Sequence, residues 1–136
     1  MKNRDVASTL MGLTVAWNMY GFATNFFERA WRDTPIPVTP IAYALNAAIA
    51  IFAPLTRAGK RWISLTSTVL GVLMAVWSAI GVLFMSDRET QMAPGMPGAA
   101  GPGVAAVLGA MIAVFGRRAY GEKEPRLDAK RWSPFR

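Results

Sequence analysis

A long apolar stretch of the chain runs from Trp62 to Ser86, and no Asp, Glu, Lys or Arg interrupts it. As a helix it would extend about 37 Å at about 1.5 Å per residue, whereas the hydrocarbon core of a bilayer is about 30 Å thick. The stretch is therefore long enough to cross a membrane, even when the helix is tilted.

Three further apolar stretches repeat this pattern. We predict transmembrane helices over residues of about 6–27, 38–56, 62–86 and 103–120. The basic loop between the second and third stretches is so short that the chain must return antiparallel. The sequence thus predicts an all-α fold, an integral membrane four-helix bundle that is antiparallel and covers residues 1–120. A polar, basic tail over residues 121–136 follows it.

The first stretch has an alternative interpretation as a signal peptide, because Lys2 and Arg4 precede it. The uncharged run is longer than an ordinary signal-peptide core, however, and Asn18 and Tyr20 interrupt its apolar pattern. We therefore favour a first transmembrane helix that is retained.

Basic residues are distributed unevenly between the two sides of the predicted bundle. Together, the N-terminus, the loop after residue 56 and the segment 117–136 (the end of the fourth helix and the tail) hold 12 Lys and Arg, and the other two loops hold 3. Because Lys and Arg concentrate on the cytoplasmic side, both termini are predicted to be cytoplasmic. We expect a bacterial-type inner (plasma) membrane.

The net charge of +7 raises a second possibility, since a basic protein attracts nucleic acid. The sequence has no basic segment interleaved with aromatic residues, which such binding uses. The predicted partners are therefore the lipid bilayer and either another membrane protein or further copies of this chain, with no nucleic acid.

The chain contains no Cys and no His. It thus lacks thiolate nucleophiles and the commonest general base, metal ligand and haem ligand. No Asp, Glu, Lys or Arg lies in the interior of a predicted helix either, whereas ion-coupled carriers commonly keep such a residue there. We predict a protein that is not an enzyme, with no catalytic residue, no cofactor and no metal.

Two further hypotheses remain open, one for an enzyme and one for a metal-binding protein. An enzyme acting on a lipid or quinone would need limited acid–base chemistry from Tyr20, Tyr43, Glu28 or Asp33. A Cu(I) site would use the thioethers of Met85, Met92 and Met96.

Small residues recur at every fourth position of each predicted helix, as they do where membrane helices pack closely. We expect the rows of the third and fourth helices to face protein rather than lipid. The rows are Ser8, Gly12 and Ala16; Ala42, Asn46 and Ala50; Ser67, Gly71, Ala75 and Ala79; and Gly101, Ala105, Gly109 and Ala113.

The strongest polar groups inside the predicted helices are Asn18 and Asn46, and both lie at the depth of Ser78. In an antiparallel bundle these three side chains form one polar layer, which can act as a clasp that fixes helix register. The alternative is a site for a neutral, quinone-like ligand, lined by Asn18, Tyr20, Tyr43, Asn46 and Trp77.

These observations favour an accessory or scaffolding subunit of a larger membrane complex. The alternative is a small oligomeric carrier or binder of a neutral or lipophilic ligand. A packed polar layer would favour the subunit, and a cavity at that layer would favour the carrier.

Overall fold

The computed structural model describes residues 2–24, 38–84 and 100–123, and in these ranges it contains four α-helices and no strand. The all-α prediction is confirmed. The helices are α1 (Asn3–Ala23), α3 (Val38–Arg57), α4 (Arg61–Phe84) and α5 (Ala100–Tyr120). Parts of the predicted first and third helices (25–27 and 85–86) and most of the predicted tail (124–136) lie outside the described residues.

The ends of the helices follow from local sequence. Asp5 occupies the first turn of α1, where a carboxylate interacts favourably with the helix dipole. Pro102 lies near the start of α5, where its missing N–H is not needed. Gly59 has a φ of 80°, a conformation that glycine adopts without strain, and it lies in the short turn that joins α3 to α4.

Three of the four helices are long and apolar enough to cross a membrane: Thr39–Arg57, Arg61–Leu83 and Ala100–Tyr120. The prediction of membrane-spanning segments is confirmed to that extent. α1 does not reach the same level of apolarity, since it carries charges near its start and several polar side chains along its length. Its crossing of the membrane stays a prediction.

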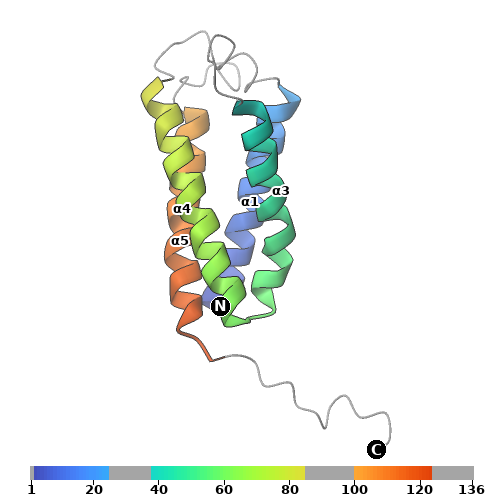
Figure 1. Cartoon of the computed structure of the whole chain (residues 1–136), viewed down its shortest axis with the longest axis vertical. Coiled ribbons are helices and arrows are strands. Elements are labelled where there is room, and N and C mark those ends of the chain that lie inside the picture. The colour runs from blue at the N-terminus through green and yellow to red at the C-terminus, as the bar shows by residue number, and fades with distance from the viewer. Residues whose placement is uncertain (1, 25–37, 85–99, 124–136) are drawn as a thin grey trace, which may run out of the picture.

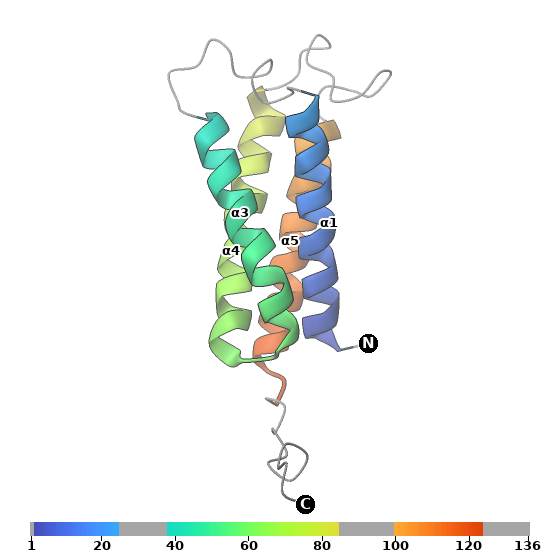
Figure 2. The ribbon, with the colours of Figure 1, turned by 90° about the vertical axis from the view of Figure 1, so that its right-hand side faces the viewer.

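The four helices stand side by side in a ring, with α1 beside α3, α3 beside α4, α4 beside α5 and α5 beside α1 (Figures 1 and 2). Contacts join the beginning of one helix to the end of its neighbour. Asn3 in α1 bonds to Glu122, just after α5, whereas Trp17 further along α1 bonds to Gly101 in the first turn of α5. The start of α1, the turn from α3 to α4 and the end of α5 therefore lie at one end of the bundle.

The buried positions of each helix alternate in spacing between three and four residues. This is the heptad pattern of helices that pack at small crossing angles with interlocking side chains. The buried rows include Ala7, Met11, Thr14, Asn18 and Gly21 in α1; Ala42, Asn46, Ile49, Ala53 and Thr56 in α3; Ser64, Ser67, Gly71, Met74 and Ser78 in α4; and Ala105, Gly109, Ile112, Gly116 and Ala119 in α5.

The closest approach of two helices is at Gly71 in α4 and Gly109 in α5. A Cβ added to Gly71 would lie 2.5 Å from the backbone nitrogen of Ala113, and one added to Gly109 would lie 2.6 Å from that of Ala75. Only glycine fits at these two positions, because larger residues would push the backbones apart. The predicted small-residue rows of these two helices therefore meet at their glycines.

Other members of the predicted rows do not face a neighbouring helix. Gly12, Ala16, Ala50 and Ala79 are exposed, and of these only Ala79 belongs to one of the two rows that are predicted to face protein. Four residues turn an α-helix by about 400°, so a fourfold row drifts about 40° at each step. A row with heptad spacing therefore stays on the face that contacts the neighbouring helix, whereas a fourfold row turns away from that face.

The outer surface of the bundle is mostly apolar, and several polar side chains lie in its interior. Buried side chains include eight that are polar, among them Thr14, Asn18 and Asn46. Large aliphatic side chains are exposed along every helix, for example Ile51, Val76 and Val107 at 61%, 55% and 60% exposure. Contiguous apolar surface of this kind is rare on soluble monomers and marks membrane or protein contact. The outer face suits contact with a lipid bilayer.

Candidate functional site

Asn18 of α1 and Asn46 of α3 form a direct hydrogen bond inside the bundle. The Nδ2 of Asn18 donates to the Oδ1 of Asn46 at 3.2 Å, and the two residues are 6% and 5% exposed. Their equal depth brings two amides together in an interior that is otherwise mostly apolar. A buried amide that lost its partner would have no water to replace it.

Ser78 is buried too, but its hydroxyl does not join this pair. It donates to the Sδ of Met74, one turn earlier on α4, at 3.5 Å. The structure thus brings together two of the three residues of the predicted polar layer. The serine satisfies its hydroxyl within its own helix, as serines in helices often do.

The aromatic residues of the hypothetical ligand site do not gather around the asparagine pair. Tyr20 and Tyr43 are 44% and 53% exposed on the outside of the bundle. The ring of Tyr43 stacks on Phe22, with centroids 4.1 Å apart and planes at 12°, so it ties α3 to α1 at the outer surface. Trp77 is half-buried in α4. The asparagines face inwards and the tyrosines face outwards.

A second group of polar side chains, which the sequence analysis missed, lies between α1, α3 and α4. The hydroxyls of Thr56 and Ser67 are 2.5 Å apart, and Thr56 contacts the Sδ of Met11 at 3.5 Å. Thr56 and Ser67 are fully buried. The predicted fourfold rows include Ser67 but not Thr56, whereas the heptad spacing of the buried positions includes both residues.

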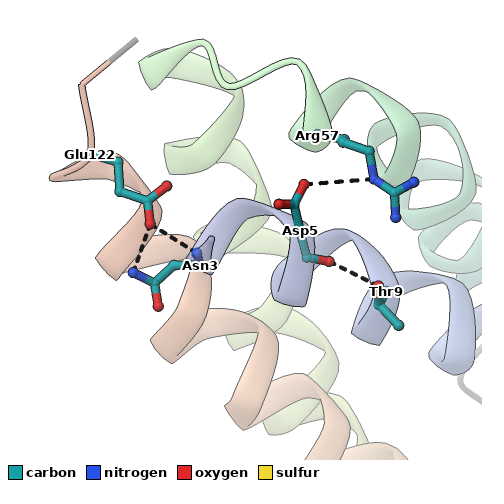
Figure 3. A network of polar contacts seen from close by, with 5 residues as sticks. All are labelled: Asn3, Asp5, Thr9, Arg57 and Glu122. Carbon is teal, nitrogen blue, oxygen red and sulfur yellow. Dashed lines mark hydrogen bonds and ion pairs between the residues drawn. The ribbon is translucent and has the colours of Figure 1, made fainter. Parts of the chain in front are cut away.

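Every charged residue in the described ranges lies at one end of the bundle, which we call the charged end. It comprises Lys2, Arg4, Asp5, Arg57, Lys60, Arg61, Arg117, Arg118, Glu122 and Lys123. Both of its acidic residues make contacts between helices (Figure 3). The Oδ1 of Asp5 lies 3.8 Å from the Nε of Arg57, which joins α1 to α3.

Glu122 caps the start of α1 from the other end of the chain. Its Oε1 accepts hydrogen bonds from the backbone N–H of Asn3 at 2.8 Å and from the Asn3 Nδ2 at 2.7 Å (Figure 3). Lys2, at the N-cap position, offers no side-chain cap of its own. A carboxylate that follows α5 therefore accepts a hydrogen bond from a backbone N–H in the first turn of α1. Its negative charge also interacts favourably with the dipole of α1.

A shallow, open apolar groove of about 380 Å³ lies on the first half of α5. Its lining residues are small or aliphatic and carry no polar side chain: Ala100, Gly103, Val104, Val107 and Leu108. None of the residues of the predicted polar layer borders it. Its chemistry suits a hydrocarbon chain or an apolar helix rather than a polar ligand.

Within the described ranges, no three Asp, Glu, His or Cys side chains come together as metal ligands. Met85, Met92, Met96, Glu28 and Asp33 all lie outside the described residues. The copper hypothesis and the acid–base hypothesis that rest on them stay predictions.

The fold and these contacts define a class of protein: a small all-α protein with three helices suited to a lipid bilayer. Comparisons of the chain with protein-family models, with curated protein sequences and with solved structures each found no match. Its function therefore has to be inferred from its own residues.

Proposed function

We propose that this chain is a small non-enzymatic integral membrane protein that serves as an accessory or scaffolding subunit of a larger membrane complex. It spans a bacterial-type inner (plasma) membrane as an antiparallel four-helix bundle with both termini in the cytoplasm. The apolar outer surface supports the membrane location. The charged end supports the orientation, since it holds eight of the described Lys and Arg residues against two acidic ones.

The observation that carries the subunit proposal is the contrast between the outer surfaces of α1 and α4. α4 presents large aliphatic side chains that suit lipid, including Leu73, Val76 and Leu83 at 51%, 55% and 79% exposure. α1 presents Gly12 and Ala16, one turn apart and both exposed, with the larger exposed side chains of Leu13 and Met19 on either side of them. No atom lies within 4 Å of a Cβ built on Gly12.

Such a surface suits a neighbouring helix better than it suits lipid. Lipid tails offer no hydrophobic drive for helices to associate, so contacts depend on close packing at small residues. The glycine pair between α4 and α5 shows this mode of packing inside the bundle, at Gly71 and Gly109. We infer that Gly12 and Ala16 form the contact with an apolar helix of a partner protein.

A lack of catalytic chemistry fits the contacts of the charged end. Asp5 and Glu122 are held in contacts that join helices, and the two buried asparagines bond to each other. These side chains serve packing and register in our proposal.

The test is extraction of the tagged full-length chain from native membranes in a mild detergent, followed by size separation and identification of co-migrating proteins. We expect a stoichiometric partner in the wild type and its loss in Gly12→Leu or Ala16→Leu. Ala79→Leu is the matched control, because it makes the same kind of change at an exposed position on α4. Migration of the wild type alone would overturn the subunit proposal, and equal loss in the control would overturn the assignment to α1.

A second candidate function is a small oligomeric carrier or binder of a neutral or lipophilic ligand. The apolar groove along α5 favours it, since its lining offers hydrocarbon contact without polar groups. This candidate predicts that the wild type migrates as a homo-oligomer, and that Asn46→Leu changes ligand binding as well as stability.

A further inference from the structure

The charged end carries more positive charge than its described carboxylates can balance. Asp5 is 3.8 Å from Arg57, and Glu122 binds Asn3 rather than a cation. Among the described residues, no carboxylate pairs with Lys60 or Arg117. This end therefore presents a net positive surface at the boundary between apolar helices and water.

The junction of α4 and α5 places two arginines on neighbouring turns of the two helices. A Cβ on Gly116 would lie 2.9 Å from the Oγ1 of Thr68 and 3.3 Å from the carbonyl oxygen of Ser64, so the end of α5 lies against the beginning of α4. Arg61 is three residues before Ser64, and Arg117 directly follows Gly116. Both arginines are exposed, and helical spacing places them on the outer side of the junction.

Aromatic residues fix the level of these arginines relative to a bilayer. The guanidinium carbon of Arg117 lies 5.3 Å from the ring centre of Tyr120. Trp62, next to Arg61, is 58% exposed, and it meets Phe52 edge to face. Exposed Trp and Tyr rings are enriched at the level of lipid headgroups.

An apolar surface continues from the arginines along both helices. Leu65 and Val72 follow Arg61 on the same side of α4, and each is 48% exposed. Ala113 and Ala110 precede Arg117 by one and two turns on α5. Phosphate binding at the arginines and hydrocarbon contact along these residues are therefore available side by side.

We propose that Arg61 and Arg117 bind the phosphate of an anionic phospholipid whose acyl chain lies along the outer junction of α4 and α5. Guanidinium groups match phosphate oxygens with paired, charge-assisted hydrogen bonds. A free phosphate ion would use the arginines alone, whereas a phospholipid uses the apolar surface too. This site rests on the membrane location in the proposed function, but not on the partner protein.

The test is native mass spectrometry of the purified full-length chain in detergent with added phosphatidylglycerol or phosphatidylcholine. We expect the wild type to prefer phosphatidylglycerol and the double variant Arg61→Gln/Arg117→Gln to bind it at least about tenfold more weakly, since the variant loses charge-assisted hydrogen bonds to the phosphate. The matched control is Lys2→Gln/Arg118→Gln, which removes the same charge from exposed positions at the same end. For the control we expect a loss of less than about threefold, because screened charges away from the site act weakly.

Size separation of both variants first establishes that they migrate as the wild type does. Equal loss in the two double variants would overturn the site, because it would show attraction to the whole charged end. Absence of a preference in the wild type would overturn it as well, and so would full displacement of phosphatidylglycerol by millimolar inorganic phosphate. Co-migration of the partner protein is measured for Arg61→Gln/Arg117→Gln as well. If the partner still co-migrates, a failure of the lipid site leaves the subunit proposal intact.

Discussion

Gly71 and Gly109 face each other across the α4–α5 interface so closely that a Cβ on Gly71 would lie 2.7 Å from the carbonyl oxygen of Gly109. The two backbones therefore touch without intervening side chains. This contact fixes the distance between α4 and α5, two of the helices that are apolar enough to cross a membrane.

Gly71→Ala is expected to destabilise the bundle by about 1–3 kcal/mol, because an added methyl forces two packed backbones apart. Gly103→Ala is the control, since nothing lies within 4 Å of its Cβ. There the higher helix propensity of alanine should leave stability unchanged or raise it by up to about 1 kcal/mol. Unfolding in mixed detergent measures both variants. Equal stability of the two variants would contradict the close contact.

The asparagine pair gives a second prediction. Asn18→Leu and Asn46→Leu should each destabilise the protein, since each leaves one buried amide without its partner. The coupling between the two sites should be about 0.6 kcal/mol and at most about 2 kcal/mol, as for other hydrogen bonds between membrane helices. A double-mutant cycle on the free energy of unfolding measures it, and strictly additive effects would show that the two amides act independently.

The cap supplied by Glu122 gives a third prediction. Glu122→Ala should lose about 1 kcal/mol of stabilisation at the start of α1, as the loss of other helix caps does. Amide hydrogen exchange in residues 3–6 should then become faster, with little change in the middle of α1. Glu122→Gln is the control, because its side-chain oxygen still accepts a hydrogen bond from Asn3. Unchanged exchange in Glu122→Ala would show that the cap does not hold α1.

Much of the fold follows from features that act within short segments. Uncharged runs of sufficient length predict the helices, and the equal depth of Asn18 and Asn46 predicts their contact, because helix rise converts sequence position directly into depth. Depth in the membrane does not predict the hydrogen bond of Ser78. Its hydroxyl has an acceptor on its own helix, Met74, and depth alone does not reveal which acceptor a side chain uses.

Other features depend on how the helices rotate and where distant segments meet. The direction in which Gly12 and Ala16 point follows from the heptad packing of the whole ring, so a fourfold pattern within α1 could not reveal it. The bond between Asn3 and Glu122 joins residues 119 positions apart. No local rule relates them, and only the closure of the ring by α1 and α5 brings them together.

The central claim is that all four helices cross the membrane with the charged end in the cytoplasm. The test of this claim is α1, because its composition alone does not establish a membrane span. The chain has no Cys, so single cysteines introduced at Lys2, Thr24 and Lys60 report on one site each. The measurement is labelling by a membrane-impermeant maleimide before and after the inner membrane is opened. We predict that Thr24→Cys, at the far end of α1, reacts in intact cells, and that Lys2→Cys and Lys60→Cys react only after opening. Labelling of Thr24→Cys from the same side as Lys2→Cys would contradict the account, because α1 would then lie on the membrane instead of crossing it.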